Sequence, residues 1–218
     1  MSNNIKAVIF DLDGTLISSH KNIYIATIKT MEKLNINYDV DEKIFNTKIG
    51  LHFKDIFEQM GIIVKDIEYF IDVYKKIYFD YIKYSTPYPN LYSTLQALYD
   101  KDVSINLLTT KSQEQAELIL KHFNIDKYFS IILGRSPHLK IKPEPDGIFN
   151  ISEKLNINVK NILMIGDTEM DVMCGQNANA RTCAVTYGYR EEEYLRNLKP
   201  DFVIDNLNIL PEIITQYK

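Results

Sequence analysis

The chain has 218 residues, 45% of them hydrophobic and 25% charged, with a formal net charge of −4. That composition is typical of a globular protein, and the length allows one large domain or two small ones around a sizeable core. The acidic balance and the scattered Lys and Arg argue against nucleic acid or an anionic membrane as the main partner.

The cysteines and the N-terminal sequence bear on the compartment. Cys174 and Cys183 are too few for a disulfide framework and lack the spacing of a metal site. The N-terminus has none of the features of a signal peptide, and no apolar run approaches the roughly 20 residues of a membrane span. We therefore expect a soluble, cytoplasmic protein whose cysteines stay reduced.

Four short apolar runs are separated by stretches of helical periodicity. They span residues 7–10, 103–108, 129–133 and 162–165. Near-continuous apolar strands that alternate with helices predict an α/β fold, a parallel sheet with helices on both faces. Ligands of such sheets bind beyond the carboxyl ends of the strands. Polar residues follow three of the runs at that edge, namely Asp11, Thr109 with Thr110, and Gly166 with Asp167.

The segment from residue 17 to residue 84 interrupts this alternation, because it shows helical periodicity and no convincing strand. One apolar stripe consists of Tyr24, Ile28, Met31 and Leu34. A longer stripe consists of Ile67, Phe70, Ile71, Tyr74, Ile77, Tyr78 and Tyr81. We interpret the longer stripe as a packing face. Pro87 and Pro89 mark the return to the α/β pattern, so we expect an inserted helical unit.

Asp11 and Asp13 stand where the first apolar run ends, in the stretch VIFDLDGTL. Carboxylates at the end of a buried strand are costly unless something binds there. A calcium loop of the EF-hand type needs glycine at its sixth position, whereas Gly14 is fourth here. Two hard carboxylates on one loop suit Mg²⁺, and a carboxylate can also be a nucleophile toward phosphorus. A plain surface turn is the alternative.

Four stretches resemble, in order, the four signatures of the haloacid dehalogenase superfamily of phosphohydrolases. They are VIFDLDGTL, LLTTKS, IKPEPDGI and MIGDTEMDV. The similarity continues through VTYGYR and KPDFVIDNL and so covers essentially the whole chain. The most similar subgroup is the phosphoglycolate phosphatase and pyrophosphatase type. This resemblance implies a Rossmann-like catalytic core of residues 1–16 and 85–218, with residues 17–84 as the family's helical C1 cap.

The resemblance also implies a Mg²⁺-dependent phosphatase that works through an aspartyl-phosphate. Asp11 would attack phosphorus in line and would bind Mg²⁺ through its other oxygen. Asp13 would act first as an acid and then as a base, and its backbone carbonyl would be a further metal ligand. Asp167 would supply the second carboxylate ligand.

Further residues would stabilise the transferring phosphoryl group. Thr109 would donate its hydroxyl to one oxygen, helped by backbone N–H groups at the start of the next helix. Lys142 would place a positive charge between Asp11 and the phosphoryl group. Asp171, interpreted as one helical turn beyond Asp167, would orient Lys142 or metal-bound water. The remaining supporting residues are Thr110 and Gly166.

Two positions depart from the pattern common in that superfamily. Ser18 stands where relatives often carry an acidic residue, which we interpret as a lost structural contact and not as lost chemistry. Asn179 stands where glycine is common after the helix of the fourth signature. Asparagine is the next-best residue for a left-handed helix end, so we expect it to be tolerated.

Within the insert, the stretch TKIGLHFKDIF resembles the substrate-specificity loop of the cap, with Gly50 at its turn. Lys48, His52 and Lys54 cluster there. In one interpretation, one or two of them face the active site and bind a second anion of the substrate. That would favour phosphoglycolate or pyrophosphate over a neutral sugar phosphate. In the other interpretation they form a solvated run of charge.

The expected partner is a small phosphorylated metabolite, hydrolysed by a monomer or homodimer. Asp13 argues against a dehalogenase of the same superfamily, because those enzymes lack the second carboxylate of the first signature. A sugar-phosphate mutase similar to β-phosphoglucomutase is an alternative, although Thr15 favours a phosphatase. A non-catalytic phosphate-binding protein on the same fold is a third interpretation.

Overall fold

The computed structural model of the protein describes residues 4–217. They form two compact units. The first unit runs from the start of the described chain to Leu16 and resumes at Pro87, and the second is Ile17–Thr86. No helix among the described residues is both long enough and apolar enough to cross a lipid bilayer.

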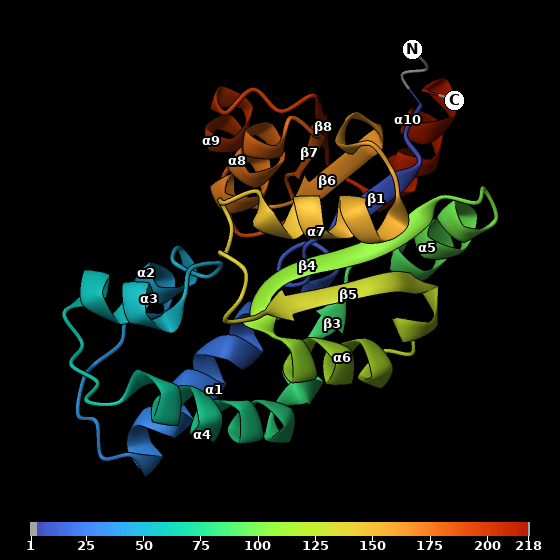
Figure 1. The fold of residues 1–218 in the computed structure, drawn as a ribbon. Helices are drawn as coiled ribbons and strands as arrows, with labels where there is room; N and C mark the ends of the chain where they lie inside the picture. Colours follow the sequence, from blue (N-terminus) through green and yellow to red (C-terminus); the bar gives the residue numbers. More distant parts are fainter. Residues whose placement is uncertain (1–3, 218) are drawn as a thin grey trace. The chain divides into compact units, whose positions relative to one another are not determined.

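The first unit is built on a six-stranded sheet (Figure 1). Its strands are β1 (Ala7–Phe10), β4 (Ser104–Ser112), β5 (Phe129–Arg135), β6 (Ile162–Gly166), β7 (Arg181–Val185) and β8 (Phe202–Ile204). They lie in the order β5-β4-β1-β6-β7-β8, and all neighbouring pairs are parallel, which confirms the predicted α/β fold. The strand order runs outward from β1 in both directions. Such a reversal marks the place where ligands bind, beyond the carboxyl end of β1.

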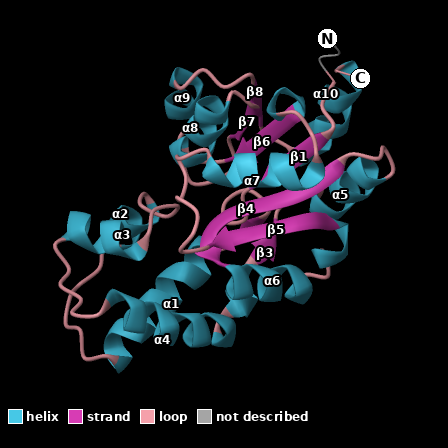
Figure 2. Cartoon of the chain, in the orientation of Figure 1, coloured by secondary structure: helices cyan, strands magenta, loops and turns pink. Residues whose placement is uncertain are grey.

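Helices surround this sheet and bury both of its faces (Figure 2). They are α5 (Leu91–Tyr99), α6 (Gln113–His122), α7 (Asp146–Leu155), α8 (Glu169–Ala178), α9 (Glu192–Asn197) and α10 (Leu210–Gln216). Short 3₁₀ helices span Asp126–Tyr128, Val159–Asn161 and Leu207–Ile209. Successive strand residues point to opposite faces, and all four residues of β1 are buried, so both faces are covered. On one face Ala7 and Ile9 pack with Ile148 of α7 and Cys174 of α8.

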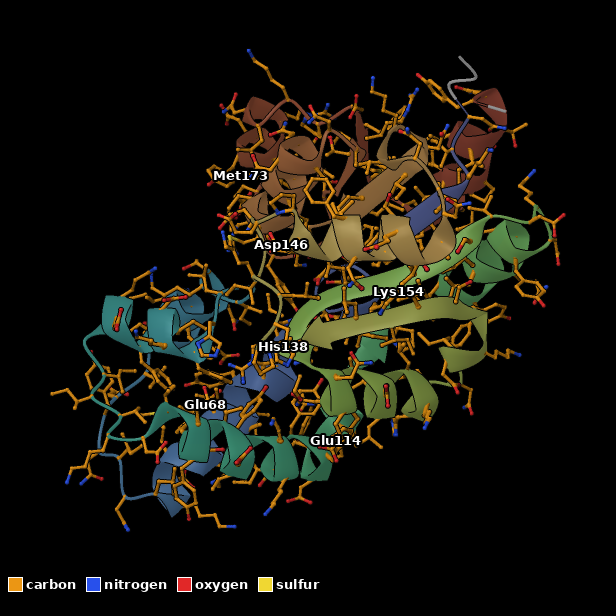
Figure 3. The ribbon with its side chains drawn as sticks, viewed as in Figure 1. Glu68, Glu114, His138, Asp146, Lys154 and Met173 are labelled. Atoms are coloured by element: carbon orange, nitrogen blue, oxygen red, sulfur yellow. The ribbon has the colours of Figure 1, made fainter. Side chains whose placement is uncertain are left out.

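The ends of α7 and α8 follow from their sequences. Helix α7 begins at Asp146 and carries Lys154 in its last turn (Figure 3), so its terminal charges complement the helix dipole. It ends at Asn156 in the left-handed conformation, with φ 52°. Asn179 ends α8 in the same way, with φ 56°, which confirms that asparagine replaces glycine there without difficulty.

The sheet differs from the four strands expected from the sequence in two respects. Strands β7 and β8 were not expected, because β7 begins with two polar residues and β8 has only three residues. Neither forms the continuous apolar run that indicates the other strands. Strand β4 continues through Thr109 and Thr110 to Ser112, instead of ending before them. Its register against β5 shifts between Leu108 and Ser112.

The second unit is helical. Its helices are α1 (His20–Lys33), α2 (Glu42–Asn46), α3 (Phe53–Met60) and α4 (Ile67–Asp80), followed by a 3₁₀ turn over Ile82–Tyr84. The longer predicted stripe lies on α4, where most of its members are buried, so its interpretation as a packing face is confirmed. Aromatic rings join α3 to α4: the Phe53 and Tyr74 centroids are 4.7 Å apart, and those of Phe57 and Phe70 are 4.9 Å apart.

Helix α1 buries a different face from the one that its apolar stripe predicts. Of the four predicted residues only Met31 is fully buried. The buried face includes Thr27 and Thr30, whose hydroxyls donate to the carbonyl oxygens of Ile23 and Ala26 at 2.7 Å. Because each hydroxyl is satisfied within its own helix, threonine can face the core here. Hydrophobic periodicity does not reveal this.

A two-stranded sheet of β2 (Ile17–Ser18) and β3 (Thr86–Pro87) also differs from expectation. The sequence indicated no strand at the beginning of the insert. Each strand has only two residues, which is too short for an alternating pattern to be recognisable.

Candidate active site

Two carboxylates lie at the carboxyl end of β1, where the strand order reverses. Asp11 follows β1 directly, and its N–H donates to the carbonyl oxygen of Ile165 at 2.9 Å. The pairing with β6 thus continues to the carboxylate and fixes its backbone. The side chains of Asp11 and Asp13 are both largely buried, with 10% and 12% of their surfaces exposed.

Lys142 lies in the loop between β5 and α7 and bridges two carboxylates. Its Nζ is 2.7 Å from Oδ1 of Asp11 and 2.5 Å from Oδ1 of Asp171. Only 4% of the side chain is exposed. Burial lowers the pKa of Lys142, but the two carboxylates raise it more, to a value above that of free lysine. The two carboxylates thus favour the charged form of the lysine. The peptide bond that follows it, to Pro143, is cis.

Asp171 lies in the first turn of α8, which begins at Glu169. Asp167 precedes the helix, so the expectation that one helical turn separates the two aspartates is wrong. The N–H and the hydroxyl of Thr168 both donate to Oδ2 of Asp171, at 3.1 and 2.7 Å. This capping arrangement starts the helix and leaves the other oxygen of Asp171 for Lys142.

Asp167 follows β6 directly, is fully buried, and accepts hydrogen bonds from two distant segments. The Thr15 hydroxyl donates to its Oδ1 at 3.0 Å, and the Tyr189 N–H donates to its Oδ2 at 2.8 Å. The Tyr187 hydroxyl donates to the carbonyl oxygen of Thr15 at 2.9 Å, which positions the first of these donors. From the sequence, Thr15 served only to favour a phosphatase over a mutase, and no contact of Thr15 or Tyr189 with Asp167 was predicted. Thr15 stands in the similar stretch VIFDLDGTL, and Tyr189 stands in the similar stretch VTYGYR.

The carboxylates form a cluster that suits a divalent cation. One oxygen each from Asp11, Asp167 and Asp171 lie within 4.8 Å of one another, and all three residues are buried. Burial raises the pKa of Asp11 to about 7, against the opposing effect of Lys142. Burial, followed by Asp171 and Asp11, raises the pKa of Asp167 well above its usual range. A cation would relieve this unfavourable accumulation of charge, and an all-oxygen donor set fits Mg²⁺.

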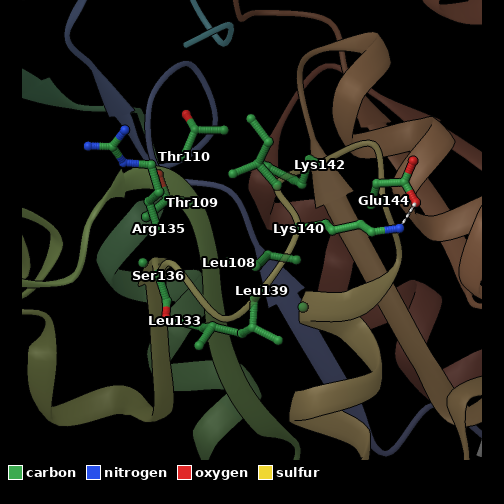
Figure 4. A pocket seen from close by; sticks show the side chains of 13 residues that line it. Leu108, Thr109, Thr110, Leu133, Arg135, Ser136, Leu139, Lys140, Lys142 and Glu144 are labelled. Carbon is green, nitrogen blue, oxygen red and sulfur yellow. Dashed lines mark ion pairs between the residues drawn. The ribbon is translucent and has the colours of Figure 1, made fainter. Parts of the chain in front are cut away.

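Thr109 and Thr110 lie on β4, next to the loop that carries Lys142. All three residues line one pocket (Figure 4). The Thr109 side chain is buried, and its Oγ1 accepts a hydrogen bond from the N–H of Lys111 at 3.3 Å. Because Oγ1 is the acceptor in that bond, the hydroxyl hydrogen remains available for another acceptor.

Lys111 is a further residue of this site that the sequence did not indicate. Its Nζ is 3.1 Å from Oδ2 of Asp13, with the two side chains only 8% and 12% exposed. Lys111 belongs to the stretch LLTTKS, next to its two threonines. From the sequence alone, a lysine at this position is interpreted as a surface residue, and only the fold shows that it contacts Asp13. Asp13 is therefore paired with Lys111, and Asp11 is paired with Lys142.

Gly14 and Gly166 allow the backbone to approach the carboxylates closely. A Cβ on Gly14, which has φ +85°, would overlap Oδ2 of Asp167, and a Cβ on Gly166 would overlap the Asp171 carboxyl group. Gly166 therefore lies against a carboxyl group of the site in which it was expected to be a supporting residue, and Gly14 does the same.

We expect Gly14→Ala to destabilise the protein by about 1–3 kcal/mol and to weaken Mg²⁺ binding, since Asp167 has to move. Gly61→Ala is the matched control, because Gly61 has φ +69° but nothing within 4 Å of the added carbon. Urea unfolding of both variants, with and without Mg²⁺, separates the cost of the φ angle from the cost of the overlap. Equal losses in the two variants would contradict the expected contact.

The four residues expected in the substrate-specificity loop lie in the second unit. Gly50 has φ 106° and forms the expected turn. Lys48 donates to Oε1 of Gln59 at 2.9 Å, and Lys54 lies 3.9 Å from Glu58. His52 is the residue before α3, and its Nδ1 accepts from the N–H of Lys54 at 3.3 Å.

Comparison with known proteins agrees with this geometry. The family described as haloacid dehalogenase-like hydrolase matches residues 8–185. This chain belongs to that family. It is 30% identical to a phosphoglycolate phosphatase of Aquifex aeolicus, over 98% of both chains, and 28% identical to the pyrophosphatase PpaX of Oceanobacillus iheyensis, over 97% of both. A solved haloacid dehalogenase-like hydrolase of Streptococcus pneumoniae superposes with a TM-score of 0.84 at 25% identity, over 100% of both chains.

The resemblance found in the sequence is thereby confirmed. The chain is an enzyme, a phosphatase of the haloacid dehalogenase-like family, and its first unit carries the sheet and the clustered aspartates. The relatives named above are described as acting on phosphoglycolate and on pyrophosphate.

Proposed function

We propose that the chain is a Mg²⁺-dependent phosphatase that hydrolyses a small phosphorylated metabolite through an aspartyl-phosphate on Asp11. One observation carries this proposal. Asp11 stands at the carboxyl end of the central strand, with Lys142 at 2.7 Å and Asp167 and Asp171 close enough to share a cation. The phosphoglycolate phosphatase and pyrophosphatase relatives support a substrate with an anionic leaving group.

Asp11 is the proposed nucleophile. One of its oxygens attacks phosphorus in line with the bond to the leaving oxygen, which gives an aspartyl-phosphate and the free alcohol or phosphate. Lys142 contacts Oδ1 of Asp11 and would meet the negative charge of the phosphoryl oxygens as they approach. Thr109 would donate its hydroxyl hydrogen to one of those oxygens. The charge of the transition state is thus met by donors already in position.

Asp13 is the proposed acid and base. It lies two residues beyond the nucleophile, and its Oδ2 is 3.1 Å from Nζ of Lys111. In the first step it would give a proton to the leaving oxygen. In the second step it would take a proton from the water that attacks the aspartyl-phosphate, which restores Asp11 and releases phosphate.

Asp11, Asp167 and the backbone carbonyl of Asp13 would hold Mg²⁺. When bound, the ion supplies positive charge that binds a phosphoryl oxygen and offsets the carboxylates. Asp171 is bonded to Lys142 and Thr168, which supports a role in orienting Lys142. Thr15 and Tyr189 would fix the orientation of Asp167.

We expect Mg²⁺ binding to weaken by at least about tenfold as the pH falls from about 8 to about 6, with uptake of protons on release of the metal. The sign follows from Asp11, whose pKa is raised to about 7, so a proton competes with the metal below that value. The same shift means that the metal-free fold loses stability as the pH rises through about 7. Calorimetric titration in two buffers of different ionisation enthalpy measures both the affinity and the protons released. Binding that is independent of pH would contradict the assignment.

The substrate-specificity residues of the second unit remain part of this proposal. Lys48, His52 and Lys54, on the turn made by Gly50, would bind the part of the substrate that is not transferred. Lys48 and Lys54 have exposed partners in the structure, which a substrate anion could replace at little cost.

A phosphate-release screen tests the proposed function. It would cover phosphoglycolate, pyrophosphate, nucleoside monophosphates and sugar phosphates, with Mg²⁺ and with EDTA. Release that needs Mg²⁺ and is strongest for one compound supports the proposal. Conversion of a sugar phosphate to its isomer without release of phosphate would favour the mutase instead. Phosphate binding without turnover by the folded protein would favour the non-catalytic alternative.

A further inference from the structure

The ion pair between Lys111 and Asp13 differs from the surface ion pairs of the first unit. Lys111 Nζ lies 3.1 Å from Asp13 Oδ2, with 8% of the lysine side chain and 12% of the aspartate side chain exposed. The nearby pair Lys140–Glu144, for comparison, is 3.9 Å apart, and its side chains are 72% and 51% exposed. Burial of the Lys111 ammonium costs hydration free energy, which an exposed ion pair keeps. The buried position of Lys111 therefore needs an explanation.

The backbone fixes where Lys111 lies. It stands in the part of β4 whose register against β5 shifts, between Leu108 and Ser112. Its N–H donates to Oγ1 of Thr109 at 3.3 Å. The same short segment therefore presents a hydroxyl and an ammonium group to the end of the sheet where Asp11 and Asp13 stand.

The place of Asp13 in the proposed reaction locates Lys111 relative to the substrate. To protonate the leaving oxygen, Asp13 has to reach it within one hydrogen bond, about 2.7 Å. The Lys111 ammonium contacts Oδ2 of the same carboxyl group, so it lies within roughly 8 Å of the leaving oxygen. Lys142, by contrast, is bonded to Asp11 and Asp171, on the side of the nucleophile. The two lysines thus serve opposite ends of the bond that breaks.

We propose that Lys111 is a specificity-determining residue that selects substrates whose leaving group carries a negative charge next to the bridging oxygen. A carboxylate or a second phosphoryl group has this chemistry. Such a group can share the ammonium of Lys111 with Asp13, whereas an uncharged alcohol offers the ammonium no negative charge. The inference rests on the proposed function and deepens it, because it assigns part of the substrate choice to the first unit.

The test compares two substrates of nearly equal size. Phosphoglycolate has a carboxylate where 2-hydroxyethyl phosphate has a hydroxymethyl group. We expect Lys111→Gln to lower kcat/KM about 10- to 100-fold more for phosphoglycolate than for 2-hydroxyethyl phosphate, mainly through KM. Lys111→Arg should keep most of the preference. Lys121→Gln removes the same charge from an exposed position on α6 and should leave the ratio unchanged.

A binding measurement keeps this inference separate from the proposed reaction. In the Asp11→Asn background, calorimetry with the same two compounds should show tighter binding of phosphoglycolate, and Lys111→Gln should remove the difference. An equal loss for both substrates, or no loss, would overturn the role of Lys111 in specificity. If Asp11→Asn is fully active, or the wild-type protein hydrolyses neither these compounds nor any other in the phosphate-release screen, the proposed function fails. The binding comparison still decides the inference in that case.

Discussion

Asp11→Asn is expected to lower kcat by about 10⁴-fold or more, because it removes the nucleophile from a reaction whose other groups act together with it. The protein should stay folded. Asparagine has the same shape, its side-chain oxygen can accept the bond from Lys142, and the buried charge of Asp11 is removed. Phosphate release from the best substrate of the screen measures the loss, and circular dichroism checks the fold.

Asp205→Asn is the matched control for this variant. Asp205 is exposed, so the same change of side chain should leave kcat within about twofold. If Asp11→Asn kept a tenth or more of the wild-type activity in preparations free of wild-type enzyme, Asp11 would not be the nucleophile.

Lys142→Met is expected to destabilise the metal-free protein by about 3–5 kcal/mol, since it leaves the buried carboxylates of Asp11 and Asp171 without their cation. Hydrolysis should also be lost. The destabilisation should be larger at about pH 8 than at about pH 5.5. Lys142 lowers the pKa of Asp11, so without the lysine that pKa rises further and the fold tolerates only the protonated form. Urea unfolding at both pH values measures the difference.

Two further variants make this prediction specific. Lys142→Met combined with Asp171→Asn removes one of the two uncompensated charges, and it should recover part of the stability but none of the activity. Lys140→Met changes an exposed lysine two positions earlier, whose side chain is 72% exposed, and should change the free energy of unfolding by less than about 0.5 kcal/mol. A Lys142→Met protein as stable as wild type at both pH values would contradict the role of this lysine.

The sequence predicted the central part of the fold because those strands are buried on both faces. The runs that became β1 and β6 are wholly apolar, so they are recognisable without any knowledge of their neighbours. Strands β7 and β8 have partly polar or very short sequences, and only their neighbours in the sheet define them. Helix α1 also could not be predicted fully from its apolar residues. The hydroxyls of its buried threonines donate to carbonyl oxygens of the same helix, so these polar residues can face the core.

The residues of the candidate site likewise fall into those that the sequence predicted and those that it did not. Asp11, Lys142 and Asp167 have roles at this site that the family resemblance already implies. Thr15 and Tyr189 do not, since their contacts with Asp167 span 152 and 22 residues of chain and exist only after folding. Lys111 is the clearest case. It lies in the part of β4 where the register shifts, and it pairs with Asp13 from a distant part of the chain, which no local pattern predicts.

Trapping the phosphorylated enzyme tests the central claim most directly. Asp13→Asn would be mixed with an aryl phosphate, whose leaving group needs little help from an acid, and quenched in acid. Because the base for the second step is missing, we expect one phosphoryl group per chain to accumulate. Borohydride reduction followed by peptide mass spectrometry should locate it at Asp11, as homoserine. A phosphoryl group on another residue, or fast release of phosphate with no phosphorylated enzyme, would contradict the aspartyl-phosphate mechanism.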